Sequence, residues 1–293
     1  MISGIVIINK EKGCTSNDVV RKTKKIFNTK VGHTGTLDPN ATGVLPLLLG
    51  DATKISKYLI NHNKEYEAVI QLGEKRTTAD VEGEIIEKKI VDSNMLEKDK
   101  IEKALKSFVG KNEQIPPIYS AIKVDGKKLY EYARAGKQVE IRPRHIEIYD
   151  IELVSINKEE KQITFKVKCS KGTYIRTLCE DISAKLDSVG YMKELNRIEV
   201  GEFNIKDAIT ISDLEEKIKN NDFSSVLQIE DIFKDCERME LKEKDYLKYL
   251  NGISLKANEN LKDGVCKVYV NGQFTGLGII KNGMIKRDLV LTK

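Results

Sequence analysis

The sequence predicts a mixed α/β protein built from two domains, a large N-terminal one and a small β-rich one. The chain has 293 residues, which is enough for two domains and a sizeable core. In its first two thirds, short apolar runs typical of strands alternate with segments of helical period. A polar, acidic stretch over 208–235 is then typical of a connector, and short strands and glycines follow it. We therefore place the domains at 1–230 and 231–293.

Composition and charge narrow the class of protein. The chain carries 50 basic and 45 acidic residues, a net charge of +5, which permits a polyanionic partner without requiring one. Its five cysteines form no C-x-x-C pair, so we expect no metal site, no cofactor held by cysteine and no disulfide framework. No signal peptide is evident, and no apolar run approaches 18 residues. We therefore expect a cytoplasmic protein with no membrane partner.

The first segments of the chain have clear local patterns. Residues 4–8 are continuously apolar and β-branched, which predicts a buried strand. Residues 16–27 predict a helix with an N-cap and an acidic first turn. Its basic side chains are as compatible with a solvated face as with RNA contact. A second helix is expected after Gly50. The strand at 64–73 alternates, which places Tyr66 on the same face as other inward residues.

Residues 32–50 form the most unusual stretch, with four glycines, two prolines and only two titratable side chains, His33 and Asp38. Asp38 precedes Pro39, which disfavours a helical conformation at Asp38. An isolated Asp-Pro is usually a turn starter. A carboxylate on a glycine-rich loop followed by an apolar run is, however, well suited to face a substrate.

The middle of the chain combines basic and aromatic residues. A helix is expected over 99–109, and a hairpin turn at Asp125-Gly126 is followed by a short helix that ends at Gly136. Residues 111–147 hold eight basic and five acidic residues, with tyrosines among them. This composition fits contacts with RNA phosphates and bases, although a plain surface hairpin would also explain it.

The later segments continue the alternation of strands and helices. Strands are expected over 146–154 and 162–169, followed by S-K-G-T-Y-I-R, in which Gly172 allows a tight turn and Thr173 can cap a helix. In extended geometry Tyr174 and Arg176 would share a face. A further helix is expected near 213–219. Residues 234–293 carry twelve basic and eight acidic residues, which suits contact with an RNA backbone.

These motifs together resemble the TruB family, the tRNA pseudouridine-55 synthases. The loop matches G-H-x-G-x-L-D-P-x-A-x-G-x-L-P at every fixed position. The middle segment resembles P-P-x-Y-S-A-x-K-x-x-G-x-x-x-Y-x-x-A-R-x-G, and K-G-T-Y-I-R matches in full. Two turns depart from the family: D-K-P reads Asn9-Lys10-Glu11 here, and T-D-T-x-D-x-x-G is shortened over 76–83. We do not expect the second turn to bear chemistry.

The resemblance implies a fold, a reaction and roles for particular residues. The fold is a catalytic domain with a central mixed or antiparallel sheet, an RNA-binding insertion at about 111–147, and a C-terminal PUA-like β-barrel. The reaction is conversion of uridine-55 in the tRNA T-loop to pseudouridine, without cofactor, metal or guide RNA. A monomer that binds the tRNA T-arm is expected. The implied site comprises Asp38 as nucleophile, His33 at the flipped nucleotide, Tyr66 and Tyr174 at the base, Arg176 paired with Asp38, Leu195 as the apolar floor and Lys10 in support.

Three other functions stay open at this point. A non-enzymatic RNA-folding protein on the same scaffold would not need the intact Asp38, Tyr174 and Arg176. A guide-RNA-dependent relative would have less use for an insertion that contacts tRNA directly. A carboxylate-based nucleoside glycosidase would need a second catalytic carboxylate, and none stands out in the sequence.

Overall fold

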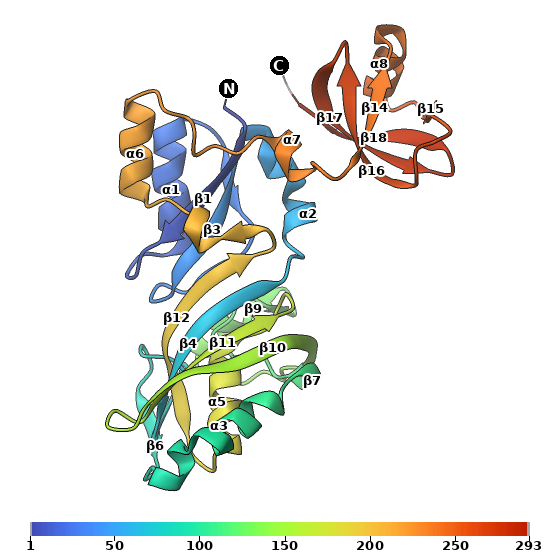
Figure 1. Ribbon diagram of the computed structural model, residues 1–293. Helices are drawn as coiled ribbons and strands as arrows, with labels where there is room; N and C mark the ends of the chain where they lie inside the picture. The colour runs from blue at the N-terminus through green and yellow to red at the C-terminus, as the bar shows by residue number, and fades with distance from the viewer. Residues whose placement is uncertain (1, 292–293) are drawn as a thin grey trace.

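A nine-stranded mixed sheet is the centre of the protein in the computed structural model, which describes residues 2–291 (Figure 1). Seven strands follow the order β1-β3-β12-β4-β11-β10-β7, β2 pairs with β3, and β13 pairs with β12. β3 and β12 are parallel, and the other pairs are antiparallel. The strands are β1 (Gly4–Lys10), β2 (Val31–His33), β3 (Thr42–Leu49), β4 (Lys64–Leu72), β7 (Gly110–Gln114), β10 (Arg144–Asn157), β11 (Gln162–Cys169), β12 (Gly190–Val200) and β13 (Phe203–Asn204). The predicted mixed sheet is confirmed.

The helices begin and end close to the expected positions. α1 is capped one residue earlier than the Ser16 start suggested, because Thr15 and Asp18 form a reciprocal capping box. The helices are α1 (Ser16–Phe27), α2 (Ser56–Leu59), α3 (Lys98–Lys106), α4 (Leu129–Arg134), α5 (Ile175–Lys185), α6 (Ile211–Lys219), α7 (Ile229–Ile232) and α8 (Glu243–Leu250), with 3-10 turns η1 (Gly50–Ile55), η2 (Ser93–Leu96) and η3 (Ile205–Asp207). Within residues 2–291, no helix is long and apolar enough to cross a membrane.

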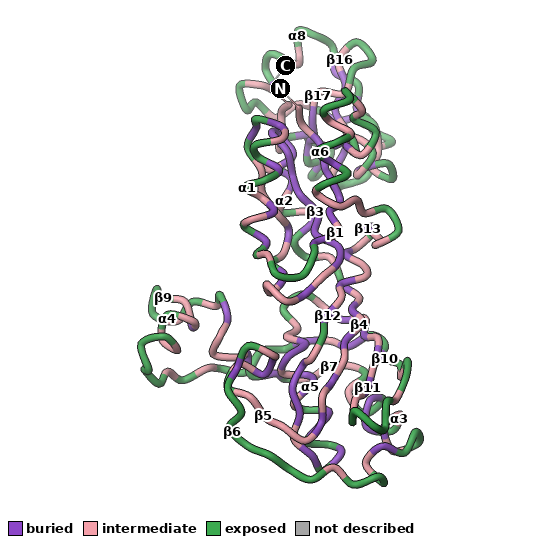
Figure 2. Tube along the Cα trace, turned by 90° about the vertical axis from the view of Figure 1, so that its left-hand side faces the viewer, coloured by how far each residue is buried: buried purple, intermediate pink, exposed green. Residues whose placement is uncertain are grey.

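Both faces of β1 are buried, which explains its continuous apolar sequence. Val6 and Ile8 pack into the same core as α1. Ile5 and Ile7 pack on the other face with η1 and with Leu277 and other side chains of the C-terminal sheet. Figure 2 shows the buried path through β1 and β3. The first strand therefore joins two cores.

The stretch over 208–235 is more than a connector. Its helix α6 packs against α1, and Leu214 is fully buried. Leu227 exchanges two backbone hydrogen bonds with Ile5, and the amide of Ile209 donates to the carbonyl of Ile7. The prediction missed this because the segment is polar on average, while its few apolar residues recur at helical spacing on one face.

The insertion between β7 and β10 projects away from the body of the molecule (Figure 2). It contains the hairpin β8 (Lys123–Val124) and β9 (Lys127–Lys128), followed by α4. Asp125 and Gly126 have φ values of 48° and 80°, as a two-residue hairpin turn requires, so the predicted turn is confirmed. A second hairpin, β5 (Glu74–Arg76) and β6 (Ile85–Lys88), directly follows β4 in the sequence.

A curled five-stranded sheet forms the C-terminal part of the protein (Figure 1). Its order is β14-β16-β17-β18-β15, and its strands are β14 (Glu237–Leu241), β15 (Leu255–Lys256), β16 (Gly264–Val270), β17 (Gln273–Lys281) and β18 (Met284–Val290). With α8 it encloses its own core around Tyr249, Val268 and Ile285. This half-barrel is compatible with the PUA-like domain, which stays a prediction, as does the boundary at 230/231.

Candidate active site

A cavity of about 810 Å³ opens between the central sheet and the insertion. It is lined by the loop before β3, by β4 and β12, by the insertion, and by the turn that precedes α5. Five of the predicted site residues line it, namely Asp38, Tyr66, Tyr174, Arg176 and Leu195. The fold therefore brings together residues that are up to 157 positions apart in the sequence (from 38 to 195).

The loop that carries Asp38 connects two paired strands. β2 and β3 are antiparallel, with His33 opposite Leu47, so residues 34–41 leave the sheet between them. The amide of Ala41 donates to the carbonyl of Asp38, which closes a tight turn at the carboxylate. The glycine-rich sequence is needed here, because Gly43 has φ of 103° where β3 meets β12.

Two buried cations hold this loop from opposite sides. The Nζ of Lys10 donates to the carbonyls of Pro39 and Ala41, at 3.1 and 2.7 Å. Arg197 Nη2 donates to Gly35 at 3.0 Å, and its Nε donates to the Val44 carbonyl at 2.8 Å. Each of the two basic side chains is 1% exposed. The supporting place predicted for Lys10 is therefore a set of hydrogen bonds to the loop backbone.

Arg197 is a residue that the sequence analysis did not single out. Burial lowers the pKa of Arg197, and no carboxylate of the described residues is paired with it, so backbone carbonyls hold its donors. Its position two residues after Leu195 in β12 was the available signal. Residues two apart in a strand lie on the same face, so Arg197 shares the face of Leu195. The sequence analysis predicted that the face of Leu195 lines the pocket.

Asp38, which the sequence analysis predicts to be the catalytic carboxylate, is paired with an arginine. Arg176 Nε lies 3.1 Å from Asp38 Oδ2, with the Asp38 side chain 37% exposed and that of Arg176 9% exposed. Partial burial raises the pKa of Asp38, and the Arg176 guanidinium acts in the opposite direction. The pair thus holds a carboxylate that remains reachable from the cavity.

Arg176 is itself fixed by three further groups. Its Nη1 donates to the Thr78 carbonyl at 3.3 Å and lies 3.6 Å from Asp80 Oδ2, and its Nη2 donates to the Tyr119 carbonyl at 3.0 Å. The turn over 76–83 therefore supports the pair of Asp38 and Arg176, a structural part that the sequence analysis did not assign to it. Sequence reasoning missed Asp80 because Asp80 meets Arg176 only through the tertiary fold.

The turn before α5 differs in detail from the prediction. α5 begins at Ile175 with Tyr174 as N-cap, so Tyr174 and Arg176 are not two residues of one extended strand. The hydroxyl of Thr173 donates to the Ser170 carbonyl at 3.0 Å and does not cap the helix. Instead, the Gln114 side-chain amide holds both backbone groups of Tyr174, at 2.8 and 3.0 Å. Gln114 is thus a positioning residue that the sequence did not reveal.

Tyr66 and Leu195 form an apolar wall of the cavity. In the register of β4 and β12, Tyr66 lies opposite Arg197, and Ala68 lies opposite Leu195. Tyr66 is 8% exposed and Leu195 is 9% exposed. Burial raises the pKa of Tyr66, so its phenol is neutral at physiological pH.

His33 does not line the cavity with the other predicted residues. It ends β2, and its Nδ1 accepts a hydrogen bond from the Gly35 amide at 3.2 Å. Burial lowers the pKa of His33, and Arg197 adds to this effect, so the imidazole is neutral at pH 7. The structure places it at the base of the loop, and its contact with RNA stays a prediction.

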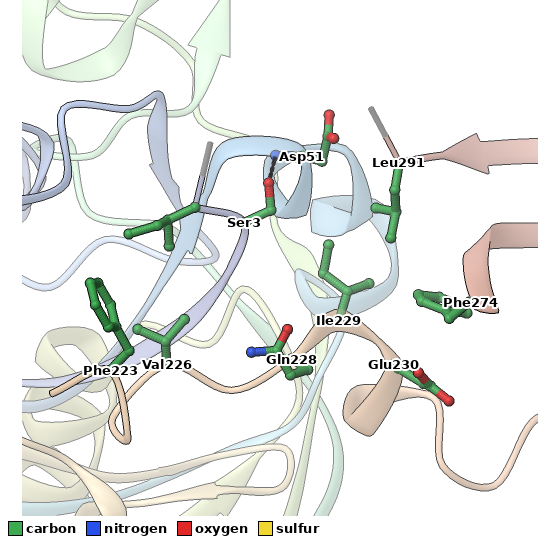
Figure 3. Close-up of a pocket in the computed structure, with 10 residues that line it drawn as sticks. Ser3, Asp51, Phe223, Val226, Gln228, Ile229, Glu230, Phe274 and Leu291 are labelled. Carbon is green, nitrogen blue, oxygen red and sulfur yellow. Dashed lines mark hydrogen bonds between the residues drawn. The ribbon is translucent and has the colours of Figure 1, made fainter. Parts of the chain in front are cut away.

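A second cavity, of about 540 Å³, lies where the C-terminal sheet meets the first domain (Figure 3). Phe274 and Leu291 line it from one side, and Ser3 and Asp51 line it from the other. Its carboxylates already have partners: Asp51 pairs with Lys54, and Glu230 accepts a hydrogen bond from the Tyr269 hydroxyl. We therefore interpret this cavity as a seam between two packed parts. Within residues 2–291, no group of three or more His, Cys, Asp or Glu side chains is placed to bind a metal ion.

Comparisons with known proteins identify the class and the family. Residues 22–175 match the model of the TruB family pseudouridylate synthase N-terminal domain, and residues 176–239 match that of the tRNA pseudouridylate synthase B C-terminal domain. The class is therefore that of pseudouridylate synthases, which are isomerases. The chain is 42% identical to tRNA pseudouridine synthase B of Francisella philomiragia, over 97% of this chain and 93% of that protein. It is 43% identical to the protein of that name from Alkaliphilus oremlandii, over 96% and 94%. The chain belongs to the TruB family.

Solved structures support the same fold. A Cbf5-Nop10-Gar1 complex contains a chain with a TM-score of 0.68 and 26% identity, which covers 94% of this chain and 78% of the other. A structure of an H/ACA RNP bound to a substrate RNA containing 2'-deoxyuridine has a TM-score of 0.70 at 24% identity, over 99% and 85%. The bounds of the two family models do not follow the sheets, because β12 lies between β3 and β4 of the central sheet but falls in the C-terminal model.

Proposed function

We propose that this protein converts uridine-55 in the T-loop of tRNA to pseudouridine, with Asp38 as the nucleophile. The observation that carries the proposal is the Asp38 carboxylate, paired with Arg176 at 3.1 Å and reachable from the 810 Å³ cavity. The names of the relatives support tRNA as the substrate. The TruB-like motifs of the loop and the insertion support the position in the T-loop.

The reaction breaks the bond between the sugar C1' and N1 of uracil and forms one between C1' and C5. The proton on C5 is lost and N1 gains one, so no redox step or activated group is needed. Asp38 bonds covalently to the base or to the sugar carbon of the nucleotide, and this bond breaks again before the product leaves. Only the ionised carboxylate is a good nucleophile, and the adjacent Arg176 favours that form.

The target uridine must first leave the base stack, which costs on the order of a few kcal/mol. Tyr66 and Leu195 would receive the base against an apolar wall, and Tyr174 would lie at its edge. The insertion projects from the body and would contact the T-arm, together with His33. A flipped base held in this way places its nucleotide within reach of Asp38.

The test is release of tritium from unmodified tRNA that carries 5-tritiated uridine. The label leaves C5 only when carbon replaces it there. We expect release by the wild type and none by Asp38→Asn, with tRNA binding by the variant retained. Release by Asp38→Asn at the wild-type rate would refute the role of Asp38. Binding without release by the wild type would favour the RNA-folding function.

The guide-RNA alternative needs its own experiment, because the similar solved structures are complexes with other proteins or RNA. We propose that the chain acts as a monomer in the cytoplasm without guide RNA. Purified protein, treated with nuclease and repurified by size exclusion, should release tritium from tRNA alone. A strict requirement for added RNA would refute this part of the proposal.

A further inference from the structure

A buried lysine in the cavity that holds Asp38 has no part in the chemistry described above. Lys64 begins β4 two residues before Tyr66, and the alternation of the strand turns both side chains inward. Lys64 is 8% exposed and lines the same cavity as Asp38 and Tyr66. A charged group of this kind is costly to bury without a compensating partner.

The structure supplies only part of that compensation. Lys64 Nζ donates to the carbonyl of His62 at 2.6 Å and, more weakly, to that of Ile60 at 3.4 Å. An ammonium has three donors, so one remains. Among residues 2–291, no carboxylate is paired with Lys64, whereas Asp38 is already engaged by Arg176. The Lys64 ammonium is therefore fixed by two backbone carbonyls and keeps one N–H donor for another acceptor.

Its neighbours are also positive. Burial lowers the pKa of Lys64 to about 8, and the charges of Arg197 and Lys171 add to this effect. Lys171 lies at the rim of the cavity, where its Nζ donates to Asn61 Oδ1 at 2.6 Å. The cavity lining as a whole contains five Lys or Arg and one carboxylate, that of Asp38. Such a site favours an anion.

We propose that Lys64 and Lys171 form a subsite for one backbone phosphate of the bound RNA, next to the nucleotide received by Tyr66. This inference rests on the proposed function. Uracil is neutral and cannot balance these cations, whereas a phosphate would accept the spare Lys64 donor in a charge-assisted hydrogen bond. It would also relieve the repulsion between Lys64, Lys171 and Arg197.

The first test changes single phosphodiester linkages of the RNA and leaves the protein the same. T-arm hairpins are made with a single neutral methylphosphonate at each linkage around the target uridine, and their affinity is measured by fluorescence anisotropy with Asp38→Asn protein, which does not turn over. We expect one linkage beside the target to be most sensitive. If no linkage there weakens binding, the subsite does not exist.

The second test compares variants in the same Asp38→Asn background. Lys64→Gln should reduce the slope of log affinity against log salt by about 0.7–0.9, the value for one phosphate contact, and Lys64→Arg should restore it. Lys219→Gln is the matched control, because Lys219 lies on α6 with its side chain 72% exposed. Lys171→Gln should give a smaller change in slope, since Lys171 is exposed at the rim.

The two tests are combined to separate binding from folding. If Lys64 contacts the sensitive phosphate, the methylphosphonate at that linkage should weaken binding by the parent but add little with Lys64→Gln. If the effects of the methylphosphonate and of Lys64→Gln on binding are additive and the salt slope is unchanged, Lys64 only stabilises the turn over 60–62. Tritium release by wild-type protein in the same preparation shows whether the proposed function holds, so that failure of the subsite alone is recognised.

Discussion

Arg176 shows how much of this site depends on the geometry of one side chain. Its three guanidinium nitrogens reach Asp38, Asp80 and two backbone carbonyls at distances of 3.0–3.6 Å. A planar fork can satisfy groups in several directions at once, whereas an ammonium is a single point of charge. A positive charge alone at position 176 would therefore not make all of these contacts.

Arg176→Lys should lower kcat for tritium release by about 100-fold, because Asp38 loses the group that orients it. The thermal midpoint should fall as well, since the Tyr119 and Thr78 carbonyls lose their donor. Lys168→Arg is a control for the opposite exchange at a half-buried ion pair with Glu199, outside the cavity. A kcat within twofold of wild type in Arg176→Lys would show that only the charge is needed.

The raised pKa of Asp38 predicts an acid limb in the pH–rate profile. Asp38 must be ionised to act as the proposed nucleophile, so kcat/KM should fall as pH falls through the pKa of Asp38, which lies above its usual value of 3.8. Asp80 contributes to the raised pKa. Asp80→Asn should therefore move the limb to lower pH, measured by tritium release between pH 4 and 8. A shift to higher pH would mean that loosening of Arg176 outweighs the lost negative charge.

The loop between β2 and β3 shows how whole elements place a single carboxylate. β1 supplies Lys10 and β12 supplies Arg197, and both donate to carbonyls of the loop or of the start of β3. These donors replace water for backbone groups that leave the sheet. The parallel contact of β3 with β12 sets the distance between Arg197 and the loop.

Gly43→Ala should be strongly destabilising because of this contact. A Cβ at position 43 would lie 2.2 Å from the Arg197 carbonyl oxygen, and φ there is 103°. We expect a loss of at least about 3 kcal/mol in the free energy of unfolding, measured with urea. Gly126→Ala is the control, because Gly126 has φ of 80° but open space around it, and should cost about 1 kcal/mol. Equal losses would show that only backbone strain matters.

The whole molecule is held together by a core shared between its two parts. Leu277 and Leu289 of the C-terminal sheet pack with Ile5 and Ile55 of the first domain. Asp288 in β18 adds polar contacts between the two parts. It accepts a hydrogen bond from the Tyr58 hydroxyl at 2.6 Å and forms an ion pair with Lys57. The shared core is what makes the C-terminal sheet part of one body.

Asp288→Ala should loosen the C-terminal sheet without harming the cavity. The Asp288 side chain is 8% exposed, so loss of its contacts should cost about 1–2 kcal/mol. Limited proteolysis within 220–236 should become faster, while tritium release from saturating tRNA stays near wild type. Asp235→Ala, at an exposed position of that segment, is the control. Equal cleavage of both variants and wild type would show that the apolar core alone holds the sheet.

The sequence by itself determined the local features of this protein. Apolar runs, helical period and turn residues predicted most strands and helices, the hairpin at Asp125-Gly126 and the loop that carries Asp38. The motifs also brought Tyr66, Tyr174, Arg176 and Leu195 into one hypothesis, and the fold places these four beside Asp38. The elements and turns depend on neighbours within a few residues, which a sequence shows directly, whereas the site hypothesis came from the resemblance to the TruB family.

Only the tertiary structure decided which distant groups support the site. Asp80, Gln114 and Arg197 act through partners that lie 60 to 162 positions away or in another element. Nothing in their local sequence sets them apart, because a buried polar side chain is defined by the groups that the fold places around it. The spare donor of Lys64 belongs to the same class, since a lysine in an alternating strand is ordinary until the fold leaves it paired with no carboxylate among residues 2–291.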